Sequence, residues 1–332
     1  MSNRRSEFDV TGEIQVSVPE AVWSAVADIV TEMFPDADFS HIGEAFDDFH
    51  KLFSGRFPGY RGCDTVYHDM QHTLDMTLAM ARLMGGYHRS GDDPQLDART
   101  VGIGIIAALF HDSGYILRTD EVERKNGAEY TQSHVSRSAE FLHDYLTGRG
   151  AEEDARLAVE IVHYTGYEKS ISEIGLNDPR HALLGKLLGT ADLMAQMADR
   201  CYLEKCRDRL YNEFVLGGLA MEDNTDGSRK LKYTSGIDLL EKTPDFIADT
   251  TDRRLNGDFE HSYRYFEYWF DGFNPYWASM QQNLEYLQKI LRGEVPPLLR
   301  RTPPCFTSNE ESLDDTQTLV ALKLKEFDDE AG

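Results

Sequence analysis

Apolar residues recur every three or four positions along most of this chain, which is the period of an amphipathic α-helix. In residues 21–34, for example, Val22, Val26, Ile29 and Val30 fall on one helical face. Residues 101–109 are apolar almost all round, which predicts a helix that is buried on every side. No convincing strand alternation and no internal repeat accompany this pattern. The sequence therefore predicts an all-α fold.

Glycine, proline and polar runs divide the chain into elements. A glycine-rich loop at 53–64 leads into the first pair of closely spaced histidines, and Gly85-Gly86 is expected to end the helix that follows them. Polar residues at 119–132 and 217–234 are expected to form loops. The expected helices cover residues 21–34, 41–53, 72–84, 101–109, 133–146, 152–163, 183–197, 203–216, 236–249, 258–269 and 275–291.

The length of 332 residues is compatible with one large domain flanked by short ends. We expect a flexible N-terminus at 1–12 and a helical domain at 13–304, with its metal-site core at about 40–200. Residues 305–332 are acidic and carry one apolar patch at 319–324, so we expect a mobile tail in which this patch alone can dock as a short helix.

The formal net charge is -24, from 58 acidic and 34 basic residues, and such a surface repels nucleic acid polymers. A small phosphorylated ligand remains compatible, because metal ions can neutralise it inside a pocket. The four cysteines form no CxxC pair and are typical of reduced thiols. With no signal peptide and no apolar run of about 18 residues, we expect a cytoplasmic protein without a membrane partner. The pattern gives no indication of an oligomeric state.

Imidazole and carboxylate side chains capable of binding metal are dispersed along the predicted helices. Because a carboxylate has two oxygens, the doublet His111-Asp112 is a good nucleus for two divalent cations that share Asp112. We expect His72, His111, Asp112 and Asp192 to hold the first cation, and Asp112, His134 and His163 to hold the second. This mixed ligation suits Mn, Fe, Mg, Zn, Co or Ni and does not select one of them.

Solvent held by two such cations is acidified and can attack phosphorus, so Asp112 is also an expected catalytic residue. The leaving oxygen then needs a proton. His68 lies four residues before His72, one helical turn away, and is the expected general acid, with Asp69 as a neighbour that could hold its tautomer. Lys125, Asn126, Arg200, Phe266 and Phe270 are the candidate substrate-binding residues.

Two local motifs resemble those of cyclic nucleotide phosphodiesterases, a branch of the HD-domain metal-dependent phosphohydrolase superfamily. Residues 67–73 (YHDMQHT) resemble that branch's Tyr-His-Asn-x-x-His-Ala segment, and residues 191–193 (ADL) resemble its Ala-Asp-Leu segment. The resemblance covers about residues 40–200. It implies an HD-domain helical bundle with additional C-terminal helices, in which His68 donates the proton and His72 and Asp192 bind metal. Departures are Asp69 in place of asparagine, and Ser113-Gly114-Tyr115 after the doublet in place of a histidine-containing continuation.

Three functions are compatible with these residues. The leading one is a phosphohydrolase that cleaves a phosphodiester in a cyclic nucleotide or a related small nucleotide. Diiron oxygenases resembling inositol oxygenase share the same ligand order, although oxygenation does not require an acid placed like His68. The third is a non-catalytic, metal-stabilised signalling module.

Overall fold

The computed structural model describes residues 6–223, 229–296 and 299–331. Over these residues the regular secondary structure is helical apart from one antiparallel hairpin, in which β1 (Met221–Asp223) pairs with β2 (Arg229–Leu231). The all-α prediction is thereby confirmed. The hairpin lies within the polar insertion expected at 217–234, of which residues 224–228 are outside the described residues.

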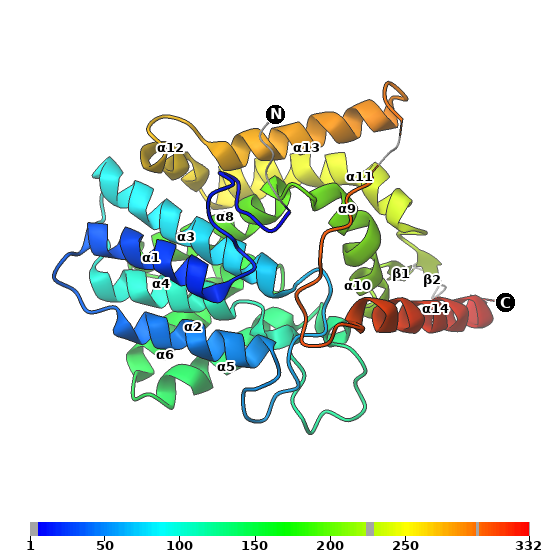
Figure 1. The fold of residues 1–332 in the computed structure, drawn as a ribbon, viewed down its shortest axis with the longest axis horizontal. Coiled ribbons are helices and arrows are strands. Elements are labelled where there is room, and N and C mark those ends of the chain that lie inside the picture. Colours follow the sequence, from blue (N-terminus) through cyan, green and yellow to red (C-terminus); the bar gives the residue numbers. More distant parts are fainter. Residues whose placement is uncertain (1–5, 224–228, 297–298, 332) are drawn as a thin grey trace.

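Most of the α-helices are joined by short connections, and the long segments 54–69, 111–133 and 292–311 are among the exceptions (Figure 1). They are α1 (Pro19–Met33), α2 (Ser40–Phe53), α3 (Met70–Ser90), α4 (Ala98–Phe110), α5 (His134–Thr147), α6 (Glu152–Val162), α7 (Ile171–Ile174), α8 (Pro179–Ala198), α9 (Tyr202–Lys205), α10 (Tyr211–Leu216), α11 (Gly236–Asp249), α12 (Tyr265–Trp269), α13 (Pro275–Leu291) and α14 (Ser312–Ala331). Single turns of tighter 3₁₀-helix are η1 (Ser113–Tyr115), η2 (Gly127–Tyr130), η3 (His163–Thr165) and η6 (Ser262–Arg264). Wider π-helical turns are η4 (Cys206–Leu210) and η5 (Thr250–Asp258). No helix within the described ranges is both long and apolar enough to span a bilayer.

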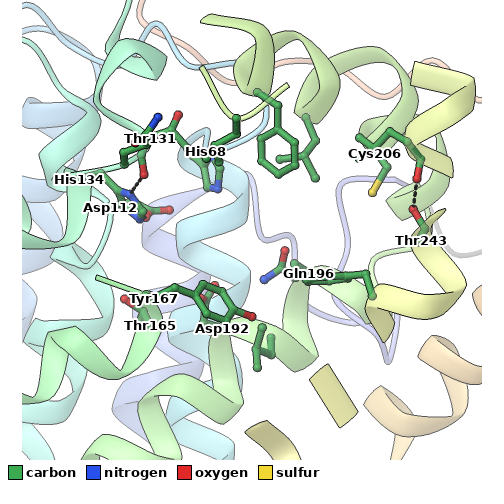
Figure 2. Close-up of a pocket in the computed structure, with 18 of the residues that line it drawn as sticks. His68, Asp112, Thr131, His134, Thr165, Tyr167, Asp192, Gln196, Cys206 and Thr243 are labelled. Atoms are coloured by element: carbon green, nitrogen blue, oxygen red, sulfur yellow. Dashed lines mark hydrogen bonds and ion pairs between the residues drawn. The ribbon is translucent and has the colours of Figure 1, made fainter. Parts of the chain in front are cut away.

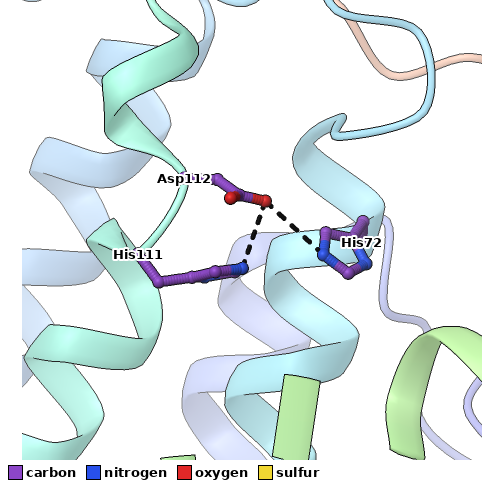
Figure 3. Close-up of side chains that lie close together, drawn as sticks. All are labelled: His72, His111 and Asp112. Carbon is purple, nitrogen blue, oxygen red and sulfur yellow. Dashed lines mark ion pairs between the residues drawn. The ribbon is translucent and has the colours of Figure 1, made fainter. Parts of the chain in front are cut away.

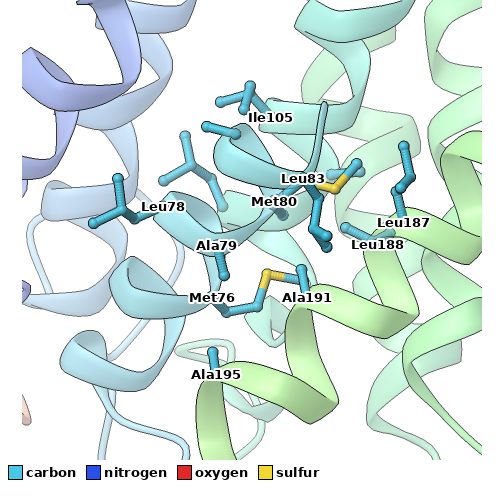
Figure 4. Packing of buried hydrophobic residues seen from close by; sticks show 14 of the residues in the cluster. Met76, Leu78, Ala79, Met80, Leu83, Ile105, Leu187, Leu188, Ala191 and Ala195 are labelled. Carbon is cyan, nitrogen blue, oxygen red and sulfur yellow. The ribbon is translucent and has the colours of Figure 1, made fainter. Parts of the chain in front are cut away.

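Three helices form the centre of the molecule, as Figure 4 shows. Met76 and Met80 of α3 face Leu187, Leu188 and Ala191 of α8, and α4 packs beside both helices. α3 is also covered by α1 and α12, so that every residue from 70 to 87 is buried. A helix enclosed in this way holds its first turn rigidly, and that turn carries His72.

The helix α3 does not end at Gly85-Gly86, as the sequence predicted, but continues to Ser90. A Cβ added at Gly86 would lie 1.8 Å from the carbonyl oxygen of Tyr265 in α12. The glycine is therefore needed for close approach of two helices and does not stop the first one. Pattern alone could not distinguish these two uses of glycine.

Both chain ends differ from the expected flexible segments. Residues 1–5 lie outside the described residues, but Asp9 is buried, accepts hydrogen bonds from Thr11 and Ile14, and pairs with Arg82 at 2.7 Å. At the other end, the expected mobile tail is instead the 20-residue helix α14, which packs on α10. The apolar patch at 319–324 is part of this docked helix.

Candidate metal centre and adjoining cavity

The central helices bring together four of the expected metal ligands. His72 is in the first turn of α3, which begins there because the Asp69 carboxylate caps it by accepting the His72 backbone N–H at 3.1 Å. His111 and Asp112 directly follow α4, and Asp192 is in α8. All four side chains are buried in the interior of the helical bundle.

The ligand atoms of His72, His111 and Asp112 lie close enough together to share a cation (Figure 3). Asp112 Oδ2 lies 3.1 Å from His111 Nε2 and 3.5 Å from His72 Nε2. Asp192 Oδ1 lies 3.4 Å from His72 Nε2 and 3.8 Å from His111 Nε2. Ligands bound at about 2.1 Å in octahedral or tetrahedral geometry are separated by about 3.0–3.4 Å. The observed separations are at or slightly above this range.

The electrostatics of the cluster also fit a cation. His111 Nδ1 donates to the carbonyl oxygen of Ala108 at 2.8 Å, which leaves Nε2 facing the carboxylates. His111 Nε2 and Asp112 Oδ2 are both buried and face each other at 3.1 Å, but neither makes a hydrogen bond of good geometry. Burial lowers the pKa of His111, but Asp112, Asp192 and the Ala108 carbonyl oxygen together outweigh it and raise that pKa to about 9. Without metal, a proton therefore occupies a position that a divalent cation can take over.

Asp112 turns its second oxygen toward His134 of α5, with Oδ1 3.9 Å from His134 Nε2. His134 Nδ1 donates to the carbonyl oxygen of Thr131 at 2.8 Å, so Nε2 keeps its lone pair for a cation. Burial lowers the pKa of His134, which favours the neutral ring that metal binding needs. His134 therefore lies beside Asp112 with a nitrogen free to bind, but the two groups alone do not make a second cluster of three ligands among the described residues.

His163 does not join this second group. Its Nε2 lies 2.9 Å from Lys169 Nζ, its Nδ1 is buried without a hydrogen bond, and the residue does not line the cavity beside the cluster. Within the described parts of the chain, the one set of three acidic, His or Cys side chains close enough to share a cation is His72, His111 and Asp112.

His68 faces the same cavity as Asp112, Asp192 and His134 (Figure 2). Its Nδ1 lies 2.5 Å from Oε2 of Glu213, a fully buried residue of α10. Burial lowers the pKa of His68, but the carboxylates of Glu213, Asp112 and Asp192, with Glu213 foremost, together raise it more, and the net direction is upward. With Nδ1 donating to Glu213, Nε2 is the nitrogen available to other partners.

Glu213 is the residue that sequence reasoning missed. The neighbouring carboxylate that we expected to orient His68, Asp69, instead caps α3 and accepts the backbone N–H of Phe306 at 3.0 Å. The available signal was a glutamate in the apolar periodicity of residues 203–216, because a carboxylate on a buried face requires a partner.

The cavity has a volume of about 570 Å³, a size typical of small-molecule sites. His68, His134, Asp112 and Asp192 form one end of it. Much of the remaining lining is apolar or aromatic, and its residues are Leu210, Phe214, Leu219, Tyr233, Leu239 and Phe246. Gln196 also faces the cavity, and its Oε1 lies 3.1 Å from the Tyr67 hydroxyl.

The five expected substrate-binding residues, Lys125, Asn126, Arg200, Phe266 and Phe270, do not line this cavity. Asn126 is buried and caps η2, and Lys125 beside it is exposed. Phe266 is buried in the core with its ring stacked on Tyr276 at 4.1 Å. The aromatic wall comes from α10, α11 and the hairpin region instead, which the sequence gave no reason to place near His68.

No protein-family model, curated protein or solved structure matches this chain. What the site can do therefore follows from its side chains. They combine a buried cluster that could hold a metal ion, a histidine held by a buried carboxylate, and a cavity that touches both.

Proposed function

We propose that this protein is a metal-dependent phosphohydrolase that cleaves a phosphodiester, in a cyclic nucleotide or a related small nucleotide. The observation that carries the proposal is the position of His68. A histidine whose pKa is raised by a buried glutamate lies in the same cavity as the metal cluster. Metal-assisted hydrolysis of an alkyl ester needs such a proton donor, whereas a structural metal site does not.

A divalent cation at His72, His111, Asp112 and Asp192 would supply an acidified water and neutralise phosphate charge. The residues of the chain account for the other half of the reaction. His68 donates the proton on Nε2 to the leaving oxygen as the P–O bond breaks, and Glu213 keeps Nδ1 protonated and stabilises the imidazolium beforehand. The resemblance of residues 67–73 to the phosphodiesterase motif agrees with this division of roles.

The charges along the cavity favour a diester. Among the described residues that line it, the cationic side chains are Lys232 and Lys242, on the hairpin and α11, and Lys242 is already paired with Asp238 at 3.0 Å. A phosphodiester carries one negative charge, which cations at the cluster can neutralise. Phosphomonoesters and triphosphates carry more charge, for which this end of the cavity offers no arginine. The apolar and aromatic part of the lining suits a nucleobase.

The proposal is tested with purified protein loaded in turn with Mn, Fe, Mg, Zn, Co and Ni. The substrates are cyclic AMP, cyclic GMP, dinucleotides, nucleoside monophosphates and nucleoside triphosphates. We expect hydrolysis of at least one diester, and its loss in Asp112→Ala but not in the exposed control Asp144→Ala. Hydrolysis of no phosphate ester, or oxygen consumption in the iron form without phosphate-ester cleavage, would exclude the proposed function.

A further inference from the structure

The ring of Tyr115 contacts two of the functional histidines at once. It is stacked on His68, with centroids 4.5 Å apart and planes 17° apart, and on His134, with centroids 4.4 Å apart and planes 18° apart. The centroids of His68 and His134 are 6.2 Å from each other. Tyr115 is thus at the apex of a triangle of rings that joins the proposed proton donor to the histidine beside Asp112.

The backbone around Tyr115 is fixed to the helix that carries His134. A Cβ added at Gly114 would lie 1.9 Å from the carbonyl oxygen of His134, so only glycine allows this approach. Gly114 N–H donates to Ser138 Oγ at 2.9 Å, and Arg137 Nε donates to the Gly114 carbonyl oxygen at 2.8 Å. The Ser113-Gly114-Tyr115 segment is therefore a rigid extension of the metal-binding doublet.

His68, by contrast, precedes α3 in a loop, and within the described residues its imidazole ring has one hydrogen-bonded side-chain partner, Glu213. With the ring attached through Cγ and hydrogen-bonded at Nδ1, the freedom that remains is a tilt of the ring plane about the line through these two atoms. Stacking against a flat, buried ring removes this freedom, because offset stacking fixes the plane of the imidazole. Tyr115 is 2% exposed, and burial raises the pKa of its hydroxyl well above the usual value, so it stays a neutral phenol.

On the basis of the proposed function, we infer that Tyr115 is a positioning residue, whose ring fixes the plane of His68 relative to the metal centre so that Nε2 faces the leaving oxygen. The hydrogen bond to Glu213 fixes the position of the His68 Nδ1 atom, and stacking on Tyr115 fixes the orientation of the imidazole plane. The two contacts are on different parts of the imidazole and are both needed to define its orientation. The hydroxyl of Tyr115 has no part in this role.

The test compares two diesters in Tyr115→Leu and Tyr115→Phe. Cyclic AMP or cyclic GMP has an alkoxide leaving group that needs a proton, whereas bis(4-nitrophenyl) phosphate releases a phenolate that does not. We expect Tyr115→Leu to lower kcat on the cyclic nucleotide about 100-fold, with KM little changed, and on the nitrophenyl ester by less than about threefold. Tyr115→Phe keeps the ring, so we expect it to hydrolyse both esters at rates close to those of the wild type. Tyr263→Leu, which removes an aromatic stacked on Trp277 outside the cavity, is the matched control.

A second measurement does not depend on activity. The proton on His68 Nδ1, in its short bond to Glu213, should give a far-downfield NMR signal that His68→Gln removes. We expect this signal to persist in Tyr115→Phe and to broaden or disappear in Tyr115→Leu. Equal losses on both esters, or a sharp unchanged signal in Tyr115→Leu, would overturn the inference while leaving the proposed function standing. If the wild type hydrolysed neither ester, the proposed function would fail and the NMR signal alone would decide the positioning role.

Discussion

Glu213 and His68 are 145 residues apart in the chain, yet their side chains form one of the shortest contacts of the site. Burial of the imidazole favours its neutral form, and Glu213, aided by the charges of Asp112 and Asp192, reverses that preference. The pair thus keeps a proton on His68 at a pH at which an isolated buried histidine would have lost it. This is the state that a general acid needs before the reaction begins.

Glu213→Gln should therefore move the alkaline limb of the kcat–pH profile to lower pH. The pKa of His68 is raised in the wild type, so removing the carboxylate lowers it, and the protonated fraction falls at neutral and alkaline pH. Glutamine keeps the shape and can still accept from the Tyr67 N–H, which limits damage to the fold. The measurement is kcat across the pH range, with Glu241→Gln at an exposed position as the control. If the alkaline limb of the profile did not shift, Glu213 would not control the protonation of the general acid.

His134 and His163 should differ in their effect on metal content. His134 Nε2 faces Asp112 Oδ1, whereas His163 Nε2 is occupied by Lys169. We expect His134→Ala to weaken binding of one cation by about 100-fold, and His163→Ala to leave the metal content nearly unchanged. Metal analysis after dialysis at graded free Mn concentrations would show this, and equal losses in the two variants would place His163 back among the ligands.

The residues of the cluster were predictable because each follows from local chain chemistry. A His-Asp doublet at the end of an apolar helix, and a carboxylate in another buried helix, require a charged partner wherever the helices pack. Glu213, Tyr115 and the docking of Lys169 on His163 were not predictable in this way. Their roles depend on which distant elements meet, and periodicity contains no information about that.

At the level of elements, the sequence located most helices because burial of one face imposes the period on the residues. The predicted helices at 236–249 and 275–291 coincide with α11 and α13. Predicted helix ends were wrong where glycine can either stop a helix or allow two helices to approach closely. Gly85-Gly86 looked like a helix end, but these glycines lie inside α3 where α12 crosses it.

Gly86→Ala should consequently destabilise the protein. The new methyl group would collide with the Tyr265 carbonyl oxygen, and α12 would have to move away from α3. Overpacking of this kind costs about 1–3 kcal/mol. Denaturant unfolding measures the change, and Gly257→Ala is the control, because an added Cβ there comes no closer than 3.4 Å to Asp252 O. Equal stability of the two variants would contradict the close approach of α3 and α12.

Over the molecule as a whole, the C-terminal segment contacts two elements that carry site residues and are distant in sequence. The Phe306 N–H donates to Asp69 and the Phe306 carbonyl oxygen accepts from Met70 N–H at 3.2 Å, so this segment holds the start of α3. Beyond it, α14 packs on α10, which carries Glu213. The sequence showed only an acidic tail with an apolar patch, because the surface that the patch covers is built by residues about 100 positions earlier in the chain.

The docking of α14 predicts that Val320→Asp lowers both stability and activity. Val320 is 6% exposed in a small apolar cluster with Tyr211 and Val215 of α10, and a carboxylate there would lose its hydration without gaining a partner. Loss of the valine burial alone corresponds to about 2 kcal/mol.

Leu322→Asp is the matched control, since Leu322 is in the same helix but 57% exposed, and it should change stability by less than about 0.5 kcal/mol. Hydrolysis and thermal unfolding of the two variants are measured together. Because α10 carries Glu213, undocking of α14 should lower kcat through the His68–Glu213 pair even below the unfolding temperature. If Val320→Asp unfolded earlier yet kept full kcat when folded, α14 would stabilise the fold without supporting the site.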